Sequence, residues 1–357
     1  MNIGIIGLPQ TGKKTLFELL VGAGSVPVQT DVRKAIRGVA DVMDPRFDRL
    51  IEMYSPKKKA QARIDIVLPS KIEEGSVSEG DIFRDLADVE VFCHVVRAFE
   101  DDAVYHVSGS LDPVRDVDYV NTEFILHDLV FLEKRLERLE KDLSKVKSES
   151  GERERDFLRE LKKVLDEERP LRRVDIAPKD EKIIRSYPLL SRREMIVVLN
   201  VGDEDVADTQ RVTEMSQRYA PAGIRIVAVA ARLESEIASL ETEDEREEFM
   251  TEMGVQDTAL HRLAGQCVDA LGLISFFTVS SDEVRQWFVR KGANAVEAAG
   301  KIHSDLARGF IRAEVIKYED LVEIGSEEKV KAAGKLAVKG KDYIVNDGDT
   351  LYIRFNV

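Results

Sequence analysis

A glycine-punctuated stretch near the N-terminus has the residue types and the spacing of a phosphate-binding loop. Gly7, Gly12 and Lys13 fit the pattern G-x-x-x-x-G-K, directly after a short apolar run at residues 3–6. In this pattern, small residues let backbone N–H groups converge on phosphate oxygens, and the lysine reaches the terminal phosphates. The plainer alternative is a strand, a turn and a helix whose glycines serve only the turn. The residues predicted to bind nucleotide here are Gly7, Pro9, Gln10, Thr11, Gly12, Lys13, Lys14 and Thr15.

The metal side of this loop departs from the same pattern. Ser or Thr normally follows the lysine because its hydroxyl ligates Mg²⁺, but here Lys14 follows, and the hydroxyl comes one residue later at Thr15. Mg²⁺ is the cofactor that such a site holds, and its candidate ligands are Thr15, Thr30 and Asp65. Thr30 lies in a long aperiodic stretch and is equally well explained as a surface residue. Because Lys14 replaces the usual ligand, the metal site is predicted to be altered.

Asp65 opens what should be a second phosphate-sensing segment. Nucleotide switches usually read D-x-x-G here, with the glycine amide close to the terminal phosphate. In this chain the glycine position holds Leu68, and Pro69 follows without an N–H group. The second switch is therefore predicted to be impaired, and whether the site hydrolyses nucleotide stays open.

A polar signature for the nucleotide base lies farther along the chain. The buried strand predicted at 194–200 delivers the N-x-x-D sequence of Asn200 and Asp203 to its C-terminal edge, where open parallel sheets bind ligands. An aspartate accepts hydrogen bonds from guanine N1–H and N2–H₂, whereas adenine presents a lone pair at N1. The spacing therefore predicts a base site that leans towards guanine. Its predicted residues are Asn200, Val201, Asp203, Ala230 and Ala231, the last two at the end of the next strand.

The elements that would position these residues indicate an α/β protein with additions. A chain of 357 residues has room for two or three domains. The spacing of leucines from Leu132 to Val146 predicts an antiparallel helical pair, a coiled-coil hairpin, around residues 119–170. From Phe276 the period becomes strand-like, which predicts a β-grasp module. The predicted domains are a P-loop domain at 1–118 and 175–275, a helical hairpin at 119–174 and a β-grasp domain at 276–357.

Composition excludes several other classes. The net charge of −14 argues against coating nucleic acid by net charge, and we predict no sequence-specific DNA binding. Cys93 and Cys267 stand far apart, which suits a reducing compartment and excludes a cysteine-built zinc site. No apolar run approaches the length of a membrane span. We therefore expect a soluble, cytoplasmic protein without a membrane partner.

Together these features resemble the YchF family, which are ribosome-associated P-loop NTPases of the Obg superfamily. The resemblance covers nearly the whole chain and is carried by Gly7-Leu8-Pro9 with Gly12-Lys13, Asp44-Pro45-Arg46, 94–97, 106–109, 121–123, 244–250 and 309–313. The most specific part is the ending, from Gly340 to Val357, which is similar to the family's TGS domain. The resemblance implies an Obg-type G domain, an inserted helical hairpin and a C-terminal ubiquitin-like β-grasp (TGS) domain.

The departures from the family pattern fall on the chemistry. Lys14 stands where the family's loop has serine, Asp65 to Leu68 stand where it has D-x-A-G, and Asp203 stands where its base-reading N-x-x-E, associated with ATP, has glutamate. The resemblance implies binding of ATP or GTP and docking on the ribosome or a translation factor, with weak hydrolysis. One alternative is an active ATPase or GTPase of the family that cleaves the β–γ phosphoanhydride bond despite Lys14. Another is a pseudo-NTPase that binds no nucleotide and serves as a ribosome adaptor.

Overall fold

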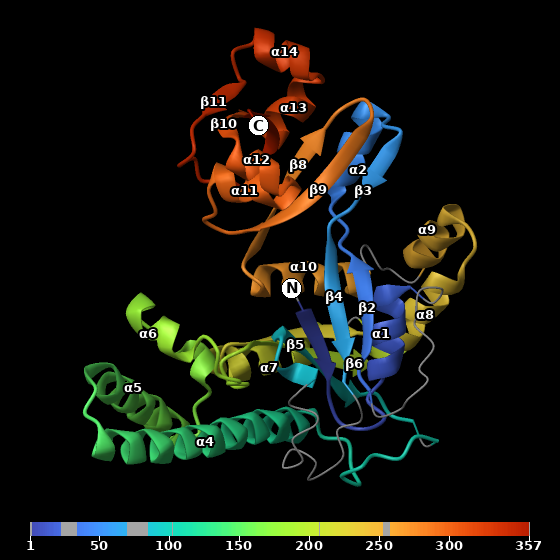
Figure 1. Ribbon diagram of the computed structural model, residues 1–357. Coiled ribbons are helices and arrows are strands. Elements are labelled where there is room, and N and C mark those ends of the chain that lie inside the picture. The colour runs from blue at the N-terminus through green and yellow to red at the C-terminus, as the bar shows by residue number, and fades with distance from the viewer. Residues whose placement is uncertain are drawn as a thin grey trace. The chain divides into compact units, whose positions relative to one another are not determined.

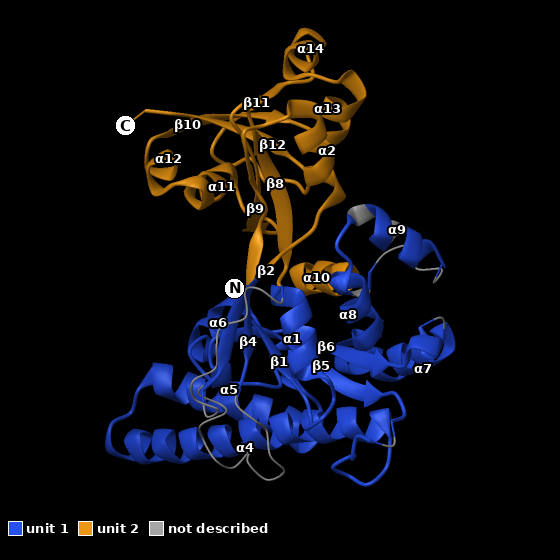
Figure 2. Ribbon diagram, turned by 90° about the vertical axis from the view of Figure 1, so that its right-hand side faces the viewer, with its two compact units in different colours: residues 1–39, 65–260 blue, residues 40–64, 261–357 orange. Residues whose placement is uncertain are grey.

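The computed structural model describes residues 2–22, 34–69, 85–101, 103–206, 208–252 and 258–356. The chain divides into two compact units, each built from two stretches of sequence (Figure 2). Unit 1 comprises Met1–Val39 and Asp65–Leu260, and unit 2 comprises Ala40–Ile64 and His261–Val357. Within the described part of the chain, no helix is long and apolar enough to cross a membrane.

Unit 1 is organised around a six-stranded sheet with the order β2-β4-β1-β5-β6-β7 (Figure 1). The strands are β1 (Asn2–Ile6), β2 (Ile36–Asp41), β4 (Arg63–Leu68), β5 (Val89–Ala98), β6 (Glu194–Val201) and β7 (Ile224–Val229), of which β2 and β4 each have two residues on the unit 2 side of the boundary. The pairings β1–β4, β1–β5, β5–β6 and β6–β7 are parallel. The central strands are buried along almost their whole length, as their continuous apolar sequences require. The predicted α/β fold is confirmed.

The helices of unit 1 cover this sheet and extend beyond it. They are α1 (Lys13–Val21), α4 (Pro113–Lys145), α5 (Glu149–Asp166), α6 (Pro178–Ile184), α7 (Thr209–Tyr219), α8 (Ala231–Ser239) and α9 (Glu243–Glu252), and α10 (Ala259–Ala270) spans the boundary with unit 2. Short 3₁₀ turns lie at η3 (Leu171–Arg173), η4 (Asp203–Asp205) and η5 (Ala220–Ala222). Helix α4 packs on the sheet through Phe124, whose ring centroid lies 4.9 Å from that of Phe92 in β5.

Helices α4 and α5 make up the helical pair that the leucine spacing predicts. Leu132, Leu136 and Leu139 of α4 pack with Leu158, Leu161 and Leu165 of α5 in one buried cluster. The helix begins before the expected residue 119, because the Asp112 side chain caps its first turn and Pro113 fixes its first residue. The expectation that Val146 continues the leucine seam is wrong, since Val146 is the C-cap of α4 and is 72% exposed.

Unit 2 is built on a second six-stranded sheet, with the order β11-β10-β12-β8-β9-β3. Its strands are β3 (Lys58–Ala60), β8 (Leu273–Val279), β9 (Glu283–Arg290), β10 (Phe310–Ile316), β11 (Ala337–Lys339) and β12 (Thr350–Phe355). Its helices are α2 (Pro45–Tyr54), α11 (Ala295–Ile302), α12 (Ser304–Arg308), α13 (Tyr318–Ile324) and α14 (Glu327–Ala332). The hairpin β8–β9 is antiparallel and β12 runs parallel to β8.

Residues 40–64 change the predicted division of the chain. Sequence patterns predict that they belong to the P-loop domain, but the structure places them in unit 2. Strand β3 pairs in parallel with β9, and Phe47 and Leu50 of α2 are buried in one apolar cluster with Phe277. The reason is that the apolar face of α2 completes the core of unit 2, a long-range contact that local sequence patterns do not reveal.

The segment Asp44-Pro45-Arg46 connects the start of α2 to the C-terminal part of unit 2. The Asp44 side chain caps α2, and Pro45 takes the first helical position. The Arg46 guanidinium donates to both carboxylate oxygens of Asp44, at 2.9 and 2.8 Å, and to Asp347 at 2.8 Å. Arg46 thus ties the early segment to the C-terminal end of the chain.

Replacing Arg46 with Met is expected to lower the free energy of unfolding of unit 2 by about 2 to 3 kcal/mol, because the buried Asp44 loses its cationic partner. The measurement is chemical denaturation followed by the fluorescence of Trp287, the chain's single tryptophan, which lies in β9. The control is Arg49→Met on the same helix, which removes an exposed ion pair with Glu52 and should cost less than about 0.5 kcal/mol. Equal losses of unfolding free energy in the two variants would show that Arg46 does not hold the two segments of unit 2 together.

Candidate functional site

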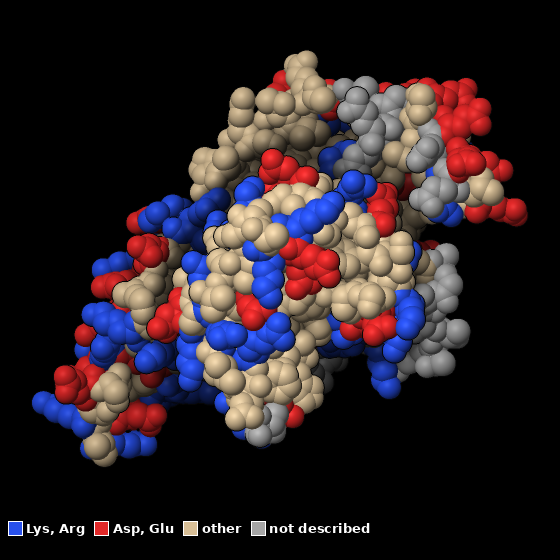
Figure 3. Space-filling view, turned by 90° about the horizontal axis from the view of Figure 1, so that it is seen from above, with Lys and Arg blue, Asp and Glu red and all other residues tan. Residues whose placement is uncertain are grey.

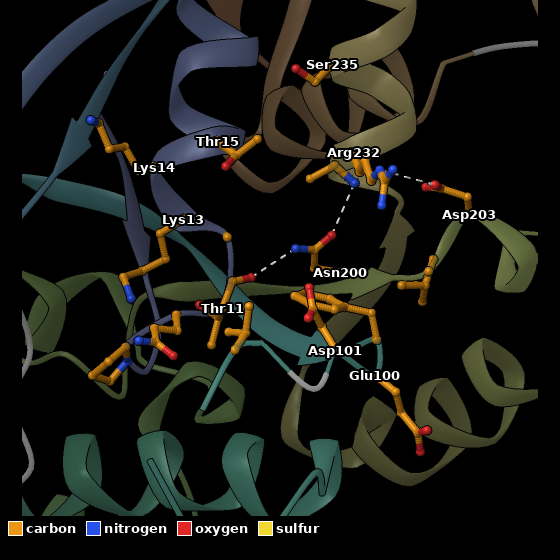
Figure 4. A pocket seen from close by; sticks show the side chains of 18 of the residues that line it. Thr11, Lys13, Lys14, Thr15, Glu100, Asp101, Asn200, Asp203, Arg232 and Ser235 are labelled. Atoms are coloured by element: carbon orange, nitrogen blue, oxygen red, sulfur yellow. Dashed lines mark hydrogen bonds and ion pairs between the residues drawn. The ribbon is translucent and has the colours of Figure 1, made fainter. Parts of the chain in front are cut away.

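A cavity of about 1450 Å³ lies in unit 1 at the carboxyl ends of its parallel strands (Figure 4). This edge is where ligands bind in open α/β sheets. The described lining residues come from six segments: residues 9–15 after β1, Ile36 at the start of β2, Leu68 and Pro69 at the end of β4, residues 99–101, 103 and 104 after β5, residues 200–204 at the end of β6, and residues 231, 232 and 235 of α8. The predicted phosphate loop and the predicted base-binding residues therefore meet in one place.

The phosphate loop has a backbone that only glycine accommodates at two positions. Gly7 has φ of 143°, and a Cβ there would lie 2.3 Å from the carbonyl oxygen of Val95. Gly12 has φ of 93°, and a Cβ there would lie 2.3 Å from Nδ2 of Asn200. Gly12 is also the N-cap of α1 and offers no side chain to the first turn of the helix. The N-terminus of α1 can therefore face an anion, as in other phosphate-binding loops.

Asn200 ties the phosphate loop to the base side of the cavity. Its Nδ2 donates to the carbonyl oxygen of Thr11 at 3.0 Å, and its Oδ1 accepts from the N–H of Ala231 at 3.1 Å (Figure 4). The Ala231 amide is therefore engaged by Asn200. Ala230 is buried and Ala231 lines the cavity.

Lys13 and His94 form the buried part of the phosphate side. The Lys13 ammonium donates to the carbonyl oxygen of Leu8, and burial lowers the pKa of Lys13 to about 8. His94 is fully buried in β5, as the sequence analysis expected for a packed strand. Burial, and secondarily the charge of Lys13, lower the pKa of His94 to about 3, so its imidazole is neutral at physiological pH.

The structure does not bring Thr15 and Asp65, two of the residues predicted for the metal, together at the cavity. The Lys14 side chain is 72% exposed, and its ammonium lies 3.6 Å from the Glu18 carboxylate, directed away from the other labelled side chains (Figure 4). Thr15 lines the cavity, and Thr30 lies outside the described residues. Across the part of the chain that the structure describes, no cluster of three or more His, Cys, Asp or Glu residues could hold a metal ion.

The placement of Asp65 corrects its assignment as a metal ligand. Asp65 is exposed and pairs in register with Asn2, at the start of β1, whereas the phosphate loop follows the other end of that strand at Ile6. The residues of this segment that reach the cavity are Leu68 and Pro69. Strand β4 runs three residues past Asp65 and ends at Leu68. The position next to the phosphate loop therefore holds the apolar side chain of Leu68. The described side chains at these positions therefore do not fit a Mg²⁺ site.

The loop after β5 forms a wall of the cavity that the sequence analysis missed. Arg97 is buried and donates to three carbonyl oxygens of this loop, those of Phe99, Asp101 and Val104, at 3.1, 3.1 and 2.7 Å. Its guanidinium also lies 4.7 Å from the centroid of the Phe99 ring. A buried arginine at the end of an apolar strand is the sequence signal that could have revealed this wall, since such a group needs several acceptors.

Asp203 lies at the base end of the cavity beside an arginine that the sequence analysis also missed. The Oδ2 of Asp203 is 3.9 Å from Nε of Arg232. The other carboxylate oxygen, Oδ1, is buried and has no hydrogen-bond partner among the described residues. Val201 lines the same region. A carboxylate thus lines the cavity at the position where the sequence predicts base recognition.

Comparison with known proteins finds similarity along the whole chain. Residues 273–356 match the family model YchF-GTPase_C, described as a protein of unknown function (DUF933). The chain is 38% identical to the ribosome-binding ATPase YchF of Bacillus subtilis over 100% of both chains. It is 34% identical to Obg-like ATPase 1 of Homo sapiens, over 100% of this chain and 92% of that one. The structure of the Schizosaccharomyces pombe YchF GTPase superposes with a TM-score of 0.84 at 27% identity, covering 99% of this chain and 97% of that one.

Proposed function

The chain belongs to the YchF family, and we propose that it binds a purine nucleotide, ATP or GTP, in the unit 1 cavity. The observation that carries this proposal is the Asn200 side chain, which bonds to both Thr11 and Ala231 and so holds the phosphate loop and the base end in one cradle. A preorganised cradle of this kind spares a ligand the cost of ordering it.

The second part of the proposal is that nucleotide hydrolysis is weak. Phosphoryl transfer in P-loop proteins depends on Mg²⁺ held by a loop hydroxyl and a strand carboxylate. Here those positions hold Lys14 and, at the edge of β4, Leu68 and Pro69. We propose that the Lys14 ammonium swings to the phosphates and supports binding without the metal. Its exposed pair with Glu18 is worth only about 0.3 to 0.5 kcal/mol, so this movement costs little.

The third part of the proposal concerns the partner. The B. subtilis relative is a ribosome-binding ATPase, and similarity along the full length of both chains supports a ribosomal or translation-factor partner for this protein as well. We therefore propose that it works in the cytoplasm, where ribosomes are. Co-sedimentation of the purified protein with ribosomes, with and without ADP or GDP, tests this part separately from nucleotide binding.

Replacing Asn200 with Ala is expected to weaken the binding of ADP and GDP roughly 10- to 100-fold. The change leaves the Thr11 carbonyl and the Ala231 N–H without their partner, and each such loss costs about 1 to 3 kcal/mol. Isothermal titration measures the affinity, and thermal denaturation checks that the variant folds. The control is Ser235→Ala, another residue lining the cavity, for which we expect less than about a threefold change. Unchanged affinity in a folded Asn200→Ala protein would remove the observation on which the proposal rests.

A further inference from the structure

Arg232 is held at the base end of the cavity by its own backbone. It is the second residue of α8, and the N–H of the preceding Ala231 donates to Asn200. This bond fixes the start of α8 against the end of β6, from which the chain continues to Asp203 in the 3₁₀ turn η4. The result is a guanidinium Nε 3.9 Å from Oδ2 of Asp203, beside a cavity that both residues line (Figure 4).

We propose that Arg232 is a specificity-determining residue for the purine base, because it competes with guanine for the Asp203 carboxylate. This inference rests on the proposed nucleotide binding. Guanine offers two donor groups, N1–H and N2–H₂, and needs both carboxylate oxygens to satisfy them. Arg232 lies 3.9 Å from one of these oxygens, so guanine must compete with the guanidinium for the carboxylate.

Adenine fits the paired arrangement without displacing it. Adenine needs only one oxygen of the Asp203 carboxylate, as the acceptor for its N6 amino group, so it can bind while Arg232 stays beside that carboxylate. The N–H groups of Arg232 can donate to the lone pair at adenine N1, which a carboxylate alone would repel. Arg232 therefore shifts the base preference of the site towards adenine. This shift offsets the preference for guanine that Asp203 alone predicts.

Glu236 opposes this effect from the same helix. It lies one turn after Arg232, and its Oε1 is 3.4 Å from the same Nε. Arg232 is thus shared between two carboxylates, and losing Glu236 should drive it towards Asp203. The Arg232 side chain is 82% exposed, so these ion pairs are weak and screened by salt. The structure accordingly points to an adjustment of base preference by a few-fold and not to absolute specificity.

The test is the ratio of GDP to ADP affinity, measured by isothermal titration of full-length wild type and variants. Arg232→Met, which keeps an unbranched stem, is expected to raise the ratio about three- to fivefold, and Glu236→Gln is expected to lower it about twofold. In an Asp203→Asn background, Arg232→Met should change the ratio very little. Raising the salt concentration should raise the ratio in wild type and leave it unchanged in Arg232→Met.

The outcomes separate this inference from the proposed function. If wild type binds neither ADP nor GDP, the proposed function fails and this inference fails with it. If wild type binds and Arg232→Met leaves the ratio unchanged, the inference alone is overturned. A fall of the ratio in Arg232→Met would likewise overturn it, because it would mean that Arg232 recognises guanine directly.

Discussion

Replacing Lys13 with Met is expected to weaken the binding of ADP and GDP by at least about 100-fold. Lys13 is the cation that follows the second glycine of the loop, and it lies partly buried against the carbonyl of Leu8. A charge-assisted bond to phosphate in such a setting is among the strongest polar contacts available to the site. The control is Lys163→Met on the exposed side of α5, which removes the same charge far from the loop and should leave affinity unchanged. Comparable binding by Lys13→Met and wild type would show that phosphate is held elsewhere.

The same lysine gives the binding a defined pH dependence. Burial lowers the pKa of Lys13 to about 8, so its charged fraction falls as the pH rises through 8. Phosphate favours the charged form, so the pKa of Lys13 rises on binding and a proton is taken up. Affinity should therefore fall by up to about tenfold per pH unit above pH 8. His94 does not contribute there, because its pKa lies near 3. Titrations between pH 7 and pH 9.5 should show this slope in wild type and no slope in Lys13→Met.

Combining Lys14→Ser with Leu68→Asp is expected to convert metal-independent binding into Mg²⁺-dependent binding. The pair of changes supplies a hydroxyl and a carboxylate where P-loop proteins hold the ion, and it removes a cation that would repel it. A unit charge pair at about 4 Å is worth on the order of 4 kcal/mol at an effective dielectric near 20, which bounds what Lys14 can give to phosphate binding. We therefore expect wild type to bind within about threefold in EDTA and Mg²⁺, and the double variant to bind at least about tenfold tighter in Mg²⁺.

Turnover provides the second measurement on the same variants. A monovalent side chain cannot bridge two phosphate oxygens in fixed octahedral geometry, so wild type should hydrolyse nucleotide more slowly than the double variant. The single variant Lys14→Ser separates the removal of the cation from the addition of the carboxylate. Thermal denaturation is needed as a control, because Leu68 is buried and an aspartate there costs stability. Wild-type turnover equal to that of the double variant would contradict an impaired site.

Local patterns were sufficient for the parts of the site that follow directly from strand ends. The spacing of Gly7, Gly12 and Lys13 and the position of Asn200 after a buried strand both depend on contiguous residues. Gly12, Lys13 and Asn200 line the cavity. Asp65 was misplaced because strand-like character does not reveal how far a strand runs before it reaches the sheet edge. Alternation along a strand shows on which face of the sheet each side chain lies. The register of β4 against β1 decides which residue of β4 lies next to the phosphate loop.

Long-range contacts account for the other differences. The membership of residues 40–64 in unit 2 depends on the pairing of β3 with β9, more than 200 residues away in sequence. The wall formed by residues 99–101, 103 and 104 depends on Arg97 donating to three backbone carbonyls, which no spacing rule describes. Arg232 was missed because a charged residue early in a helix normally reads as solvated surface, and only its distance to Asp203 gives it a role.

Titration of the wild-type protein with ADP and with GDP, in EDTA and again in Mg²⁺, tests the central proposal most directly. We expect saturable binding in both buffers, with affinities that differ by less than about threefold, because the cradle of phosphate loop, Asn200 and Lys13 needs no metal to form. Binding that appears only in Mg²⁺ would contradict the role given to Lys14. Binding in neither buffer would contradict the proposed function and favour an adaptor that uses the fold without a nucleotide.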